Sequence, residues 1–504
     1  MALFFYNQQN RISRAAASAG PKPMILAELF PYAGMVYDIV MVLYVLTVVA
    51  TIVMIVGENR NPVKSLAWAT VLVLLPVTGI VLYLLFGRSL KSRHLISRKA
   101  WRKLMATTPL ASQPSGEGKL SDGSQQQAHM AHAITHSHYY EGNDVRIFTD
   151  GKSKFDALKA DIASAHTFIH LQYYIIENDR LGGELADLLI DKARQGVQVR
   201  VIYDHVGSYT TNAALFKRLR KNGVEAHPFL KVTPATFVAR LNWRNHRKVV
   251  VIDGRVGYIG GMNIADRYVT GVKGASPWRD THLRITGPAV AGLYYSFAID
   301  WNFMSKTLLT MPKTIAKTPV TGNTAIQIVP SGPTGFFNGN SFVVLRAIAM
   351  AKKCLYIQTP YFLPSDALLK ALQVASLSGV DVRIMIPRRT DSLLLRYASG
   401  SYYKESMLAG IKIYLYDTAM LHAKVVIADD DFVTTGSSNF DFRSFEHNFE
   451  CNALIYSADF NRRMKDIFLD DQKHCQRLIL SHWRRRPLAI KAIESLARLL
   501  APIL

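Results

Sequence analysis

Two short stretches of the chain repeat the same chemically capable residues. HRKVVVID begins at His246 and HAKVVIAD begins at His422, so each holds His-x-Lys, four further residues and an Asp. The β-branched residues in each stretch predict a strand that enters a turn. Because side chains alternate across a strand, His246 shares a face with Lys248, and His422 shares a face with Lys424. Each pair can therefore address one ligand.

The closing acids of the motifs, Asp253 and Asp429, belong to the candidate catalytic set. They fall on the opposite strand face, which favours a role in fixing the turn. Each motif is followed by small and amide residues that suit a phosphate, because small residues let the backbone approach an anion and Asn or Ser can donate to its oxygens. The candidate phosphate-binding residues are Gly261, Asn263, Ser437 and Asn439.

Each copy also supplies one acid, Asp280 in WRDTHLRI and Glu450 in HNFECNALIY. A carboxylate against a histidine holds the imidazole in one tautomer and stabilises its charged form. Two histidines and two lysines on one site suit a phosphodiester: one imidazole attacks phosphorus, and the other protonates the leaving alkoxide and then activates the acceptor hydroxyl. The lysines neutralise the nonbridging oxygens. No carboxylate cluster in the sequence suits Mg²⁺, so we expect chemistry without a metal or cofactor.

A single histidine on a strand is more often an ordinary core or surface residue than a catalytic one. Here, however, the motif lies on a repeated unit, because residues 169–204 resemble residues 355–387. Each stretch reads as an apolar strand, an amphipathic helix, a glycine that ends the helix, and a second strand. This is a βαβ unit used twice. We expect an α/β fold of two halves, each a mixed sheet flanked by helices, related by a pseudo-twofold axis and sharing one site.

Two uncharged runs near the N-terminus, residues 39–56 and 65–86, are each close to the length that crosses a bilayer. A buried core helix is the alternative for each run, but two in series favour two membrane spans, and Pro76 is tolerated in a span. Lys and Arg are concentrated before the first run and after the second, which predicts that both flanks face the cytoplasm. The net charge of +23 also favours anionic partners such as membrane lipids.

Residues 106–144, rich in Ser, Gly and Gln, predict a flexible linker or a weak helix. Four histidines in it, His129, His132, His136 and His138, lack the nearby carboxylates or cysteines of a metal site, so a solvated linker is the preferred interpretation. Three cysteines without paired spacing argue against a disulfide framework.

The predicted organisation has six parts. They are an N-terminal segment (1–34), two transmembrane helices (35–88), a basic juxtamembrane region and linker (89–144), a first half (145–325), a second half (326–480) and an amphipathic tail (481–504).

The motifs resemble those of the phospholipase D superfamily, whose signature is His-x-Lys-x4-Asp in duplicate, and most closely those of bacterial cardiolipin synthases. The resemblance covers most of the chain and includes RNPVKSLAWATVLVLLPVTGIVLYLLFGR, NHRKVVVIDG, YIGGMNIADRY, TPYFLPSDALLKAL, HAKVVIADD and GSSNFDFRSFEHNFE. It implies phosphatidyl transfer between two phosphatidylglycerol molecules, giving cardiolipin and glycerol through a phosphohistidine. It further implies His246 as nucleophile, His422 as acid and base, and a multi-pass protein of the bacterial inner membrane.

Several alternatives stay open at this point. A phospholipase D-type hydrolase would show the same motifs with water as the acceptor. A nucleic-acid phosphodiesterase would explain the positive charge, but the sequence shows no basic-aromatic platform for nucleic acid, and a non-catalytic relative is disfavoured by the intact motifs. Residues 397–424 could line an acyl-chain entrance or form ordinary core, and the tail could lie on anionic lipid or pack as a terminal helix. Phosphatidylethanolamine as co-substrate and the oligomeric state are both undecided.

Overall fold

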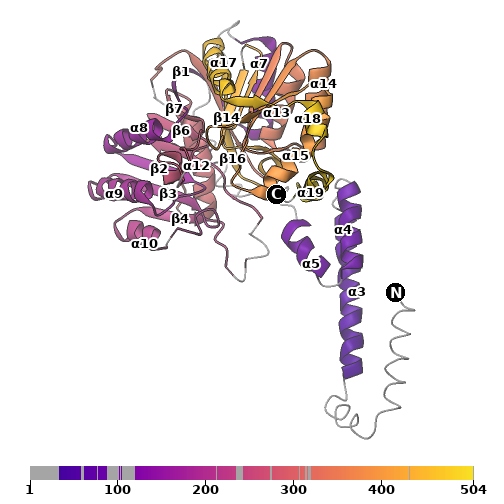
Figure 1. Cartoon of the computed structure of the whole chain (residues 1–504). Helices are drawn as coiled ribbons and strands as arrows, with labels where there is room; N and C mark the ends of the chain where they lie inside the picture. Colours follow the sequence, from indigo (N-terminus) through magenta and orange to yellow (C-terminus); the bar gives the residue numbers. More distant parts are fainter. Residues whose placement is uncertain are drawn as a thin grey trace, which may run out of the picture. The chain divides into compact units, whose positions relative to one another are not determined.

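The computed structural model describes residues 33–57, 62–75, 78–87, 102, 104 and 120–502, with gaps at 212, 234–235, 237–241, 273–274, 306, 313–314, 316–318 and 431. The chain divides into two compact units, Met1–Arg88 and Ser89–Leu504 (Figure 1).

The first unit contains helices α3 (Ala33–Gly57), α4 (Pro62–Leu74) and α5 (Thr78–Leu82) and the π-helix η1 (Tyr83–Gly87). Within α3, residues Met35–Val53 form the one helical segment in the described residues that is long and apolar enough to cross a membrane. The second predicted span is divided into α4, α5 and η1, each shorter than the roughly 20 residues that a span needs. Residues 76 and 77, which include Pro76 and lie between α4 and α5 in the sequence, are outside the described residues.

The described residues of the second unit form a mixed sheet of 15 strands in the order β17-β12-β11-β9-β13-β14-β16-β8-β1-β7-β6-β5-β2-β3-β4. Its first seven strands along the chain are β1 (Tyr139–Phe148), β2 (Phe168–Tyr173), β3 (Gln198–Asp204), β4 (Glu225–Phe229), β5 (Val249–Ile252), β6 (Val256–Gly260) and β7 (His282–Thr286). The others are β8 (Thr324–Ser331), β9 (Cys354–Gln358), β11 (Asp381–Pro387), β12 (Lys412–Tyr416), β13 (Val425–Ala428), β14 (Phe432–Gly436), β16 (Glu450–Tyr456) and β17 (Cys475–Arg477). β10 (Phe362–Leu363) pairs separately with β15 (Phe440–Asp441).

The strand order reads alike in both directions from the antiparallel β1–β8 pair at its centre. Outward from β1 come β7, β6, β5, β2, β3 and β4, and outward from β8 come β16, β14, β13, β9, β11 and β12. The predicted βαβ units are present, with β2 parallel to β3 and β9 parallel to β11. Gly196 and Gly379, which follow the crossover helices, have φ of +88° and +97°, where a side chain would be strained.

Helices flank the sheet (Figure 1). Those of the first half are α8 (Gly151–Ala163), α9 (Arg180–Arg194), α10 (Ala213–Lys221), the short 3-10 helix η3 (Asp266–Tyr268) and α12 (Val290–Met304). Those of the second are α13 (Gly339–Met350), α14 (Asp366–Leu377), α15 (Leu393–Leu408), α16 (Phe442–Glu446), α17 (Ala458–Lys473), α18 (Leu480–Arg484) and α19 (Leu488–Leu499). One apolar core contains Trp301 of α12, Val249 of β5 and Val425 of β13, so residues of both halves share it.

The stretch predicted as a flexible linker or weak helix contains an ordered helix, α7 (Asp122–Thr135), and β1 begins at Tyr139 inside it. The Ser121 hydroxyl accepts from Ser124 N at 3.2 Å and caps α7, and buried Gln127 donates to the Val343 carbonyl at 3.0 Å. Hydrogen bonds to α13 thus hold α7 on the second half. Residues 106–119 lie outside the described residues.

The tail forms α18 and α19. α19 packs on α15 through buried Ala497 and through Arg498, which pairs with Glu405 of α15 at 2.6 Å. Its other face exposes Leu488, Leu496 and Leu499. The tail therefore has both the packed face of a terminal helix and an apolar face that lipid would suit.

Candidate active site

The histidines of both His-x-Lys motifs line one cavity of about 300 Å³, whereas Lys248 and Lys424 are not among its lining residues. The first motif runs into β5 and the second into β13, and each of these strands pairs with the first strand of its βαβ unit. The cavity is lined by residues of both halves: Tyr174, Ile175, Arg244, His246, Asn263, Arg267, Tyr268, Trp278, Tyr361, Asp391, Leu395, His422, Asn439, Asp441, Arg443 and Asn448. His246 and His422 therefore line the same cavity.

Backbone hydrogen bonds tie each motif to the other half of the sheet. His246 N donates to Phe449 O at 2.8 Å, and Phe449 N donates to Arg244 O at 2.8 Å. In the same manner, His422 N donates to Arg279 O at 2.7 Å. Phe449 and Arg279 are the residues immediately before Glu450 and Asp280. These backbone bonds therefore place Glu450 beside His246 and Asp280 beside His422.

Each of the two histidines contacts a carboxylate that belongs to the other half of the sheet. Nδ1 of His246 lies 3.0 Å from Oε1 and 3.1 Å from Oε2 of Glu450. Nδ1 of His422 lies 2.6 Å from Oδ2 of Asp280. Both carboxylates are buried. A carboxylate at Nδ1 fixes the ring and leaves Nε2 as the nitrogen available to a ligand.

Two residues expected to bind phosphate instead support the carboxylates. Ser437 Oγ donates to Oε2 of Glu450 at 2.5 Å. A Cβ at Gly261 would stand 2.2 Å from Oδ1 of Asp280, so the glycine makes room for that carboxylate. Neither Gly261 nor Ser437 lines the cavity, so the contacts support a role in placing the carboxylates, and phosphate binding by these residues stays a prediction.

The pKa values of the histidines and of Glu450 follow from these contacts. Burial lowers the pKa of His246 against the opposing effect of Glu450. Burial tends to raise the pKa of Glu450, but His246, Lys248 and Ser437 outweigh it, so the group stays ionised. Burial and the adjacent Lys424 lower the pKa of His422 to about 4.

Both lysines are buried beside their own histidines. Lys248 Nζ donates to the His246 carbonyl at 2.6 Å, and Lys424 Nζ lies 2.8 Å from Nδ1 of His422. Burial lowers the pKa of Lys248 to about 7 and that of Lys424 to about 8, against the pull of the nearby carboxylates. An anion in the cavity would favour the charged form of both.

Asn263 and Asn439 line the cavity, and each amide nitrogen donates one of its two N–H groups within the protein. Asn263 Nδ2 donates to the Tyr268 hydroxyl at 3.1 Å. Asn439 Nδ2 donates to Oδ2 of Asp441 at 2.9 Å. Oδ1 of Asn439 is buried and lacks a hydrogen-bond partner among the described residues. The amide nitrogen of each asparagine carries two N–H groups, so one of them stays able to donate to a phosphate oxygen, and the phosphate-binding role of both residues stays a prediction.

Asp253 and Asp429 lie in turns and do not line the cavity. Asp253 accepts from the backbone N–H groups of His166, Thr167 and Phe168 at 2.8–2.9 Å. Asp429 accepts from three consecutive N–H groups, those of residues 352–354, at 2.7–3.0 Å. Their φ values of 51° and 46° are left-handed, a conformation that Asp tolerates better than most residues. These contacts support the expected role of both residues in fixing the turns, and their place in the catalytic set stays a prediction.

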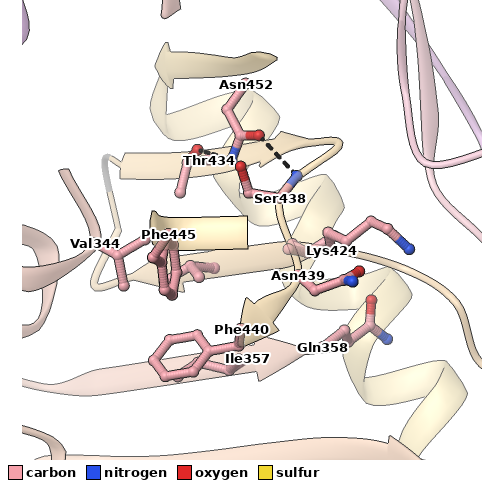
Figure 2. Close-up of a pocket in the computed structure, with 12 residues that line it drawn as sticks. Val344, Ile357, Gln358, Lys424, Thr434, Ser438, Asn439, Phe440, Phe445 and Asn452 are labelled. Carbon is pink, nitrogen blue, oxygen red and sulfur yellow. Dashed lines mark hydrogen bonds between the residues drawn. The ribbon is translucent and has the colours of Figure 1, made fainter. Parts of the chain in front are cut away.

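A smaller cavity of about 10 Å³ lies behind the second motif and is too small for a substrate (Figure 2). There the Asn452 amide bonds Thr434 Oγ1 at 3.3 Å and Ser438 N at 3.2 Å, which secures the strand-to-turn segment that leads to Asn439. Figure 2 shows Lys424 and Asn439 directing their polar ends to the same side.

Sequence reasoning missed the buried polar network behind the first motif. Arg247, inside HRK, donates to Oδ1 of Asp300 at 2.8 Å and to the Glu450 carbonyl at 2.9 Å. Gln172 also donates to Asp300, at 2.5 Å. It missed the cavity aromatics as well, including Tyr174, whose ring lies 4.9 Å from that of His246. An arginine between two motif residues was a signal that could have found the network.

Comparison with known proteins decides the family. A family model described as "Cardiolipin synthase, PLD-like domain" matches residues 158–276 and 344–472, and one described as "Phospholipase_D-nuclease N-terminal" matches residues 45–88. "Major cardiolipin synthase ClsA" of Bacillus subtilis (strain 168) is 38% identical over 475 residues, which are 92% of this chain and 98% of that protein. The chain belongs to the cardiolipin synthase family.

A second member of the cardiolipin synthase family, from Listeria monocytogenes serotype 4a (strain HCC23), is 38% identical over 485 residues, covering 94% of this chain and all of that protein (100%). The two segments matched by the cardiolipin synthase model contain His246 and His422 respectively. A solved structure titled phosphatidylserine synthase, from Haemophilus influenzae Rd KW20, covers 76% of this chain and 100% of its own with a TM-score of 0.57. Its sequence identity of 15% makes this a likeness of fold alone.

Proposed function

We propose that this protein is a cardiolipin synthase that transfers a phosphatidyl group between two phosphatidylglycerol molecules and releases glycerol. The observation that carries the proposal is the pair of histidines on one cavity, each held at Nδ1 by a carboxylate from the other half. Relatives named cardiolipin synthase that match along nearly the whole chain support it.

In the first step, Nε2 of His246 attacks phosphorus of the donor lipid. A nitrogen–phosphorus bond forms, the phosphorus–oxygen bond to the glycerol head group breaks, and His422 protonates the departing oxygen. In the second step, His422 accepts the proton of a hydroxyl on the second lipid. That oxygen bonds phosphorus, and His246 leaves. The order of the histidines is the one that the family resemblance implies.

The lysines give this chemistry its charge complementarity. Lys248 and Lys424 can neutralise the nonbridging oxygens of the phosphodiester. Drawing Lys424 Nζ from its position 2.8 Å from Nδ1 of His422 toward a phosphate would also leave Nδ1 to Asp280 alone. The pKa of His422 would then rise, because Lys424 is one of the two groups that lower it. Substrate binding would thus prepare His422 to act as an acid.

The proposal extends to the arrangement of the whole chain. The two sheet halves, roughly residues 145–325 and 326–480, are related by a pseudo-twofold axis, which the equivalent strand orders support. Residues 39–56 and 65–86 anchor the enzyme as two spans in the bacterial inner membrane, with the catalytic unit in the cytoplasm. The arginines and lysines that flank these runs support this orientation.

A conversion assay tests the proposal. Purified protein in vesicles receives head-group-labelled phosphatidylglycerol in the presence of a chelator, beside a His246→Ala variant. Labelled glycerol together with cardiolipin, absent from the variant, is the expected result. Labelled glycerol with phosphatidic acid but no cardiolipin would show a phospholipase D-type hydrolase instead, and no turnover would direct attention to another phosphodiester.

A further inference from the structure

We propose that the catalytic unit docks on an anionic lipid bilayer through an apolar rim at the edge of the sheet that carries the cavity. The apolar rim consists of the exposed side chains of Tyr209, Phe336, Phe337, Leu393 and Leu394. The inference rests on the proposed function, since that function requires lipid to enter the cavity. It concerns a membrane contact made by the catalytic unit itself, apart from the N-terminal helices.

Three strands end at the edge of the sheet where the cavity lies. β3 ends at Asp204, whose carboxylate accepts from Asn245 N, adjacent to the first motif, at 2.9 Å. β8 ends at Ser331, which pairs with Glu450 in β16. β11 ends shortly before Asp391, which lines the cavity. The loops after these three strands therefore project beyond the cavity edge of the sheet.

The loop after β3 is fastened to the cavity wall. The Ser208 hydroxyl donates to the carbonyl of cavity-lining Tyr174 at 3.1 Å, and a Cβ at Gly207 would stand 2.5 Å from the Tyr174 ring. Tyr209, the next residue along the chain, is 78% exposed. Aromatic side chains with a polar tip are enriched at the interface between a membrane and water. Tyr209 is therefore suited to contact that interface.

The loop after β8 presents two phenylalanines. The Ser331 hydroxyl donates to Oδ1 of Asn338 at 2.9 Å, which closes the loop at its base. Between these two residues, Phe336 is 72% exposed, and its ring lies edge-on to that of Phe337 with 4.9 Å between the centroids. The loop thus carries a compact apolar group beyond the edge of the sheet.

The first residues of α15 complete the apolar rim. Leu393 is 67% exposed and Leu394 is also exposed, while the next residue, Leu395, lines the cavity. Exposed apolar side chains that are scattered singly over a surface need no explanation. Here three loops place such side chains on one edge beside a cavity, which indicates a binding surface.

Cations border the leucines of the apolar rim. Arg389 and Arg396, which lie on either side of Leu393 in the sequence, are exposed and form no ion pair with any residue that the structure describes. Asp391 between them accepts from the Tyr361 hydroxyl at 2.5 Å. Basic side chains beside apolar ones are attracted to anionic lipid. A second copy of this chain, with its net charge of +23, would instead be repelled.

Photolabelling tests the inference without relying on turnover. Full-length enzyme is placed in vesicles of phosphatidylglycerol and phosphatidylcholine, and the phosphatidylcholine carries a diazirine on an acyl chain. Because this lipid is not the proposed substrate, its label reports contact with the bilayer. Peptides that contain Phe336 or Leu393 should be labelled. Label confined to Met35–Val53 would overturn the docking surface.

Leu377 is the matched control for the leucines of the apolar rim. It is 72% exposed, but it ends α14 just before β11 begins, and so it lies at the edge of the sheet opposite the cavity. The peptide that contains Leu377 should therefore remain unlabelled. Equal labelling of this peptide and of the rim peptides would show contact without a preferred face and would overturn the proposal.

Substitution supplies a second readout. Glycerol release is measured from long-chain phosphatidylglycerol in the bilayer and from monomeric short-chain phosphatidylglycerol in water. In Leu393→Asp/Leu394→Asp the ratio of the first rate to the second should fall about tenfold, the factor that corresponds to burying one leucine side chain. Leu377→Asp should leave the ratio unchanged.

The outcomes separate the docking surface from the proposed function. An unchanged ratio in Leu393→Asp/Leu394→Asp would overturn the docking surface. An unlabelled rim, together with a dimer that this double variant dissociates, would assign the surface to a second copy of the chain and would also overturn it. Labelled rim peptides without glycerol release from either substrate would overturn the proposed function while supporting the docking surface.

Discussion

Nδ1 of His246 lies 3.0 Å from Oε1 of Glu450, although the two residues are 204 positions apart in the chain. The reciprocal contact joins His422 to Asp280 at 2.6 Å over 142 positions. Neither half therefore holds either of these histidine–carboxylate pairs by itself, and each of the two histidines depends on the other half for its orientation. This relationship explains why the duplicated unit must act as one site.

Replacing Glu450 with Gln should reduce kcat by about 10²–10⁴-fold, because an amide at this position no longer fixes the Nδ1–H tautomer of His246. Steady-state cardiolipin formation would measure the change. Glu450→Asp, which keeps the charge, should recover part of the loss. An equal loss in both variants, with a fall in melting temperature, would show a structural role in place of orientation.

Removing the acid should expose the intermediate. In His422→Ala, breakdown of the phosphatidyl-enzyme loses its general base, a contribution of about 10²–10⁴-fold. Labelled lipid should accumulate on His246, to be located by mass spectrometry of peptides kept at neutral to alkaline pH. His246→Ala should carry no label. Label on His422 in the His246→Ala protein would reverse the proposed order.

The free enzyme should lose kcat/KM as the pH rises above about 7, because burial lowers the pKa of Lys248 to about 7 and the lysine becomes neutral above that value. Lys424, with a pKa of about 8, should extend the decline. Mixed micelles of neutral detergent would keep the surface pH close to that of the bulk. Lys248→Arg should move the alkaline decline to higher pH, because guanidinium stays charged. If kcat/KM of Lys248→Arg declines at the same pH as that of the unmodified enzyme, a group other than Lys248 causes the decline.

Asp253→Asn should destabilise the fold by about 1–3 kcal/mol while the folded enzyme keeps its kcat, because the carboxylate accepts three backbone N–H bonds outside the cavity. Burial tends to raise the pKa of Asp253, but these bonds and the one from the Thr167 hydroxyl lower it overall. A lowered carboxyl pKa stabilises the fold above the unfolded value near 4 and ceases to do so as the pH falls through the folded value. Denaturant unfolding should therefore show a large difference in the free energy of unfolding between the unmodified protein and Asp253→Asn at pH 7, and a small difference at pH 3. A loss of kcat without a loss of stability would instead support a catalytic role for Asp253.

Much of the local structure could be predicted because its causes lie close together in the chain. The spacing of His246 and Lys248 puts both on one face of a strand whatever that strand pairs with. The βαβ units also follow from hydrophobic periodicity and a terminal glycine, and residues 39–53 are an uncharged, mainly apolar run of the kind expected to form a helix. α7 was harder to predict, since its polar residues become buried only against α13.

The sequence by itself determined that two copies of a His-x-Lys strand would be built on two copies of one folding unit. It also identified every titratable group of the exchanged pairs, namely His246, His422, Asp280 and Glu450. Only the tertiary structure decided which carboxylate contacts which histidine. It also decided that Ser437 donates to Glu450, that Gly261 leaves room for Asp280, and that Asn439 donates to Asp441. The physical reason is that covalent spacing sets the face of a strand, whereas partners more than a hundred residues apart are set by how the two sheet halves pack.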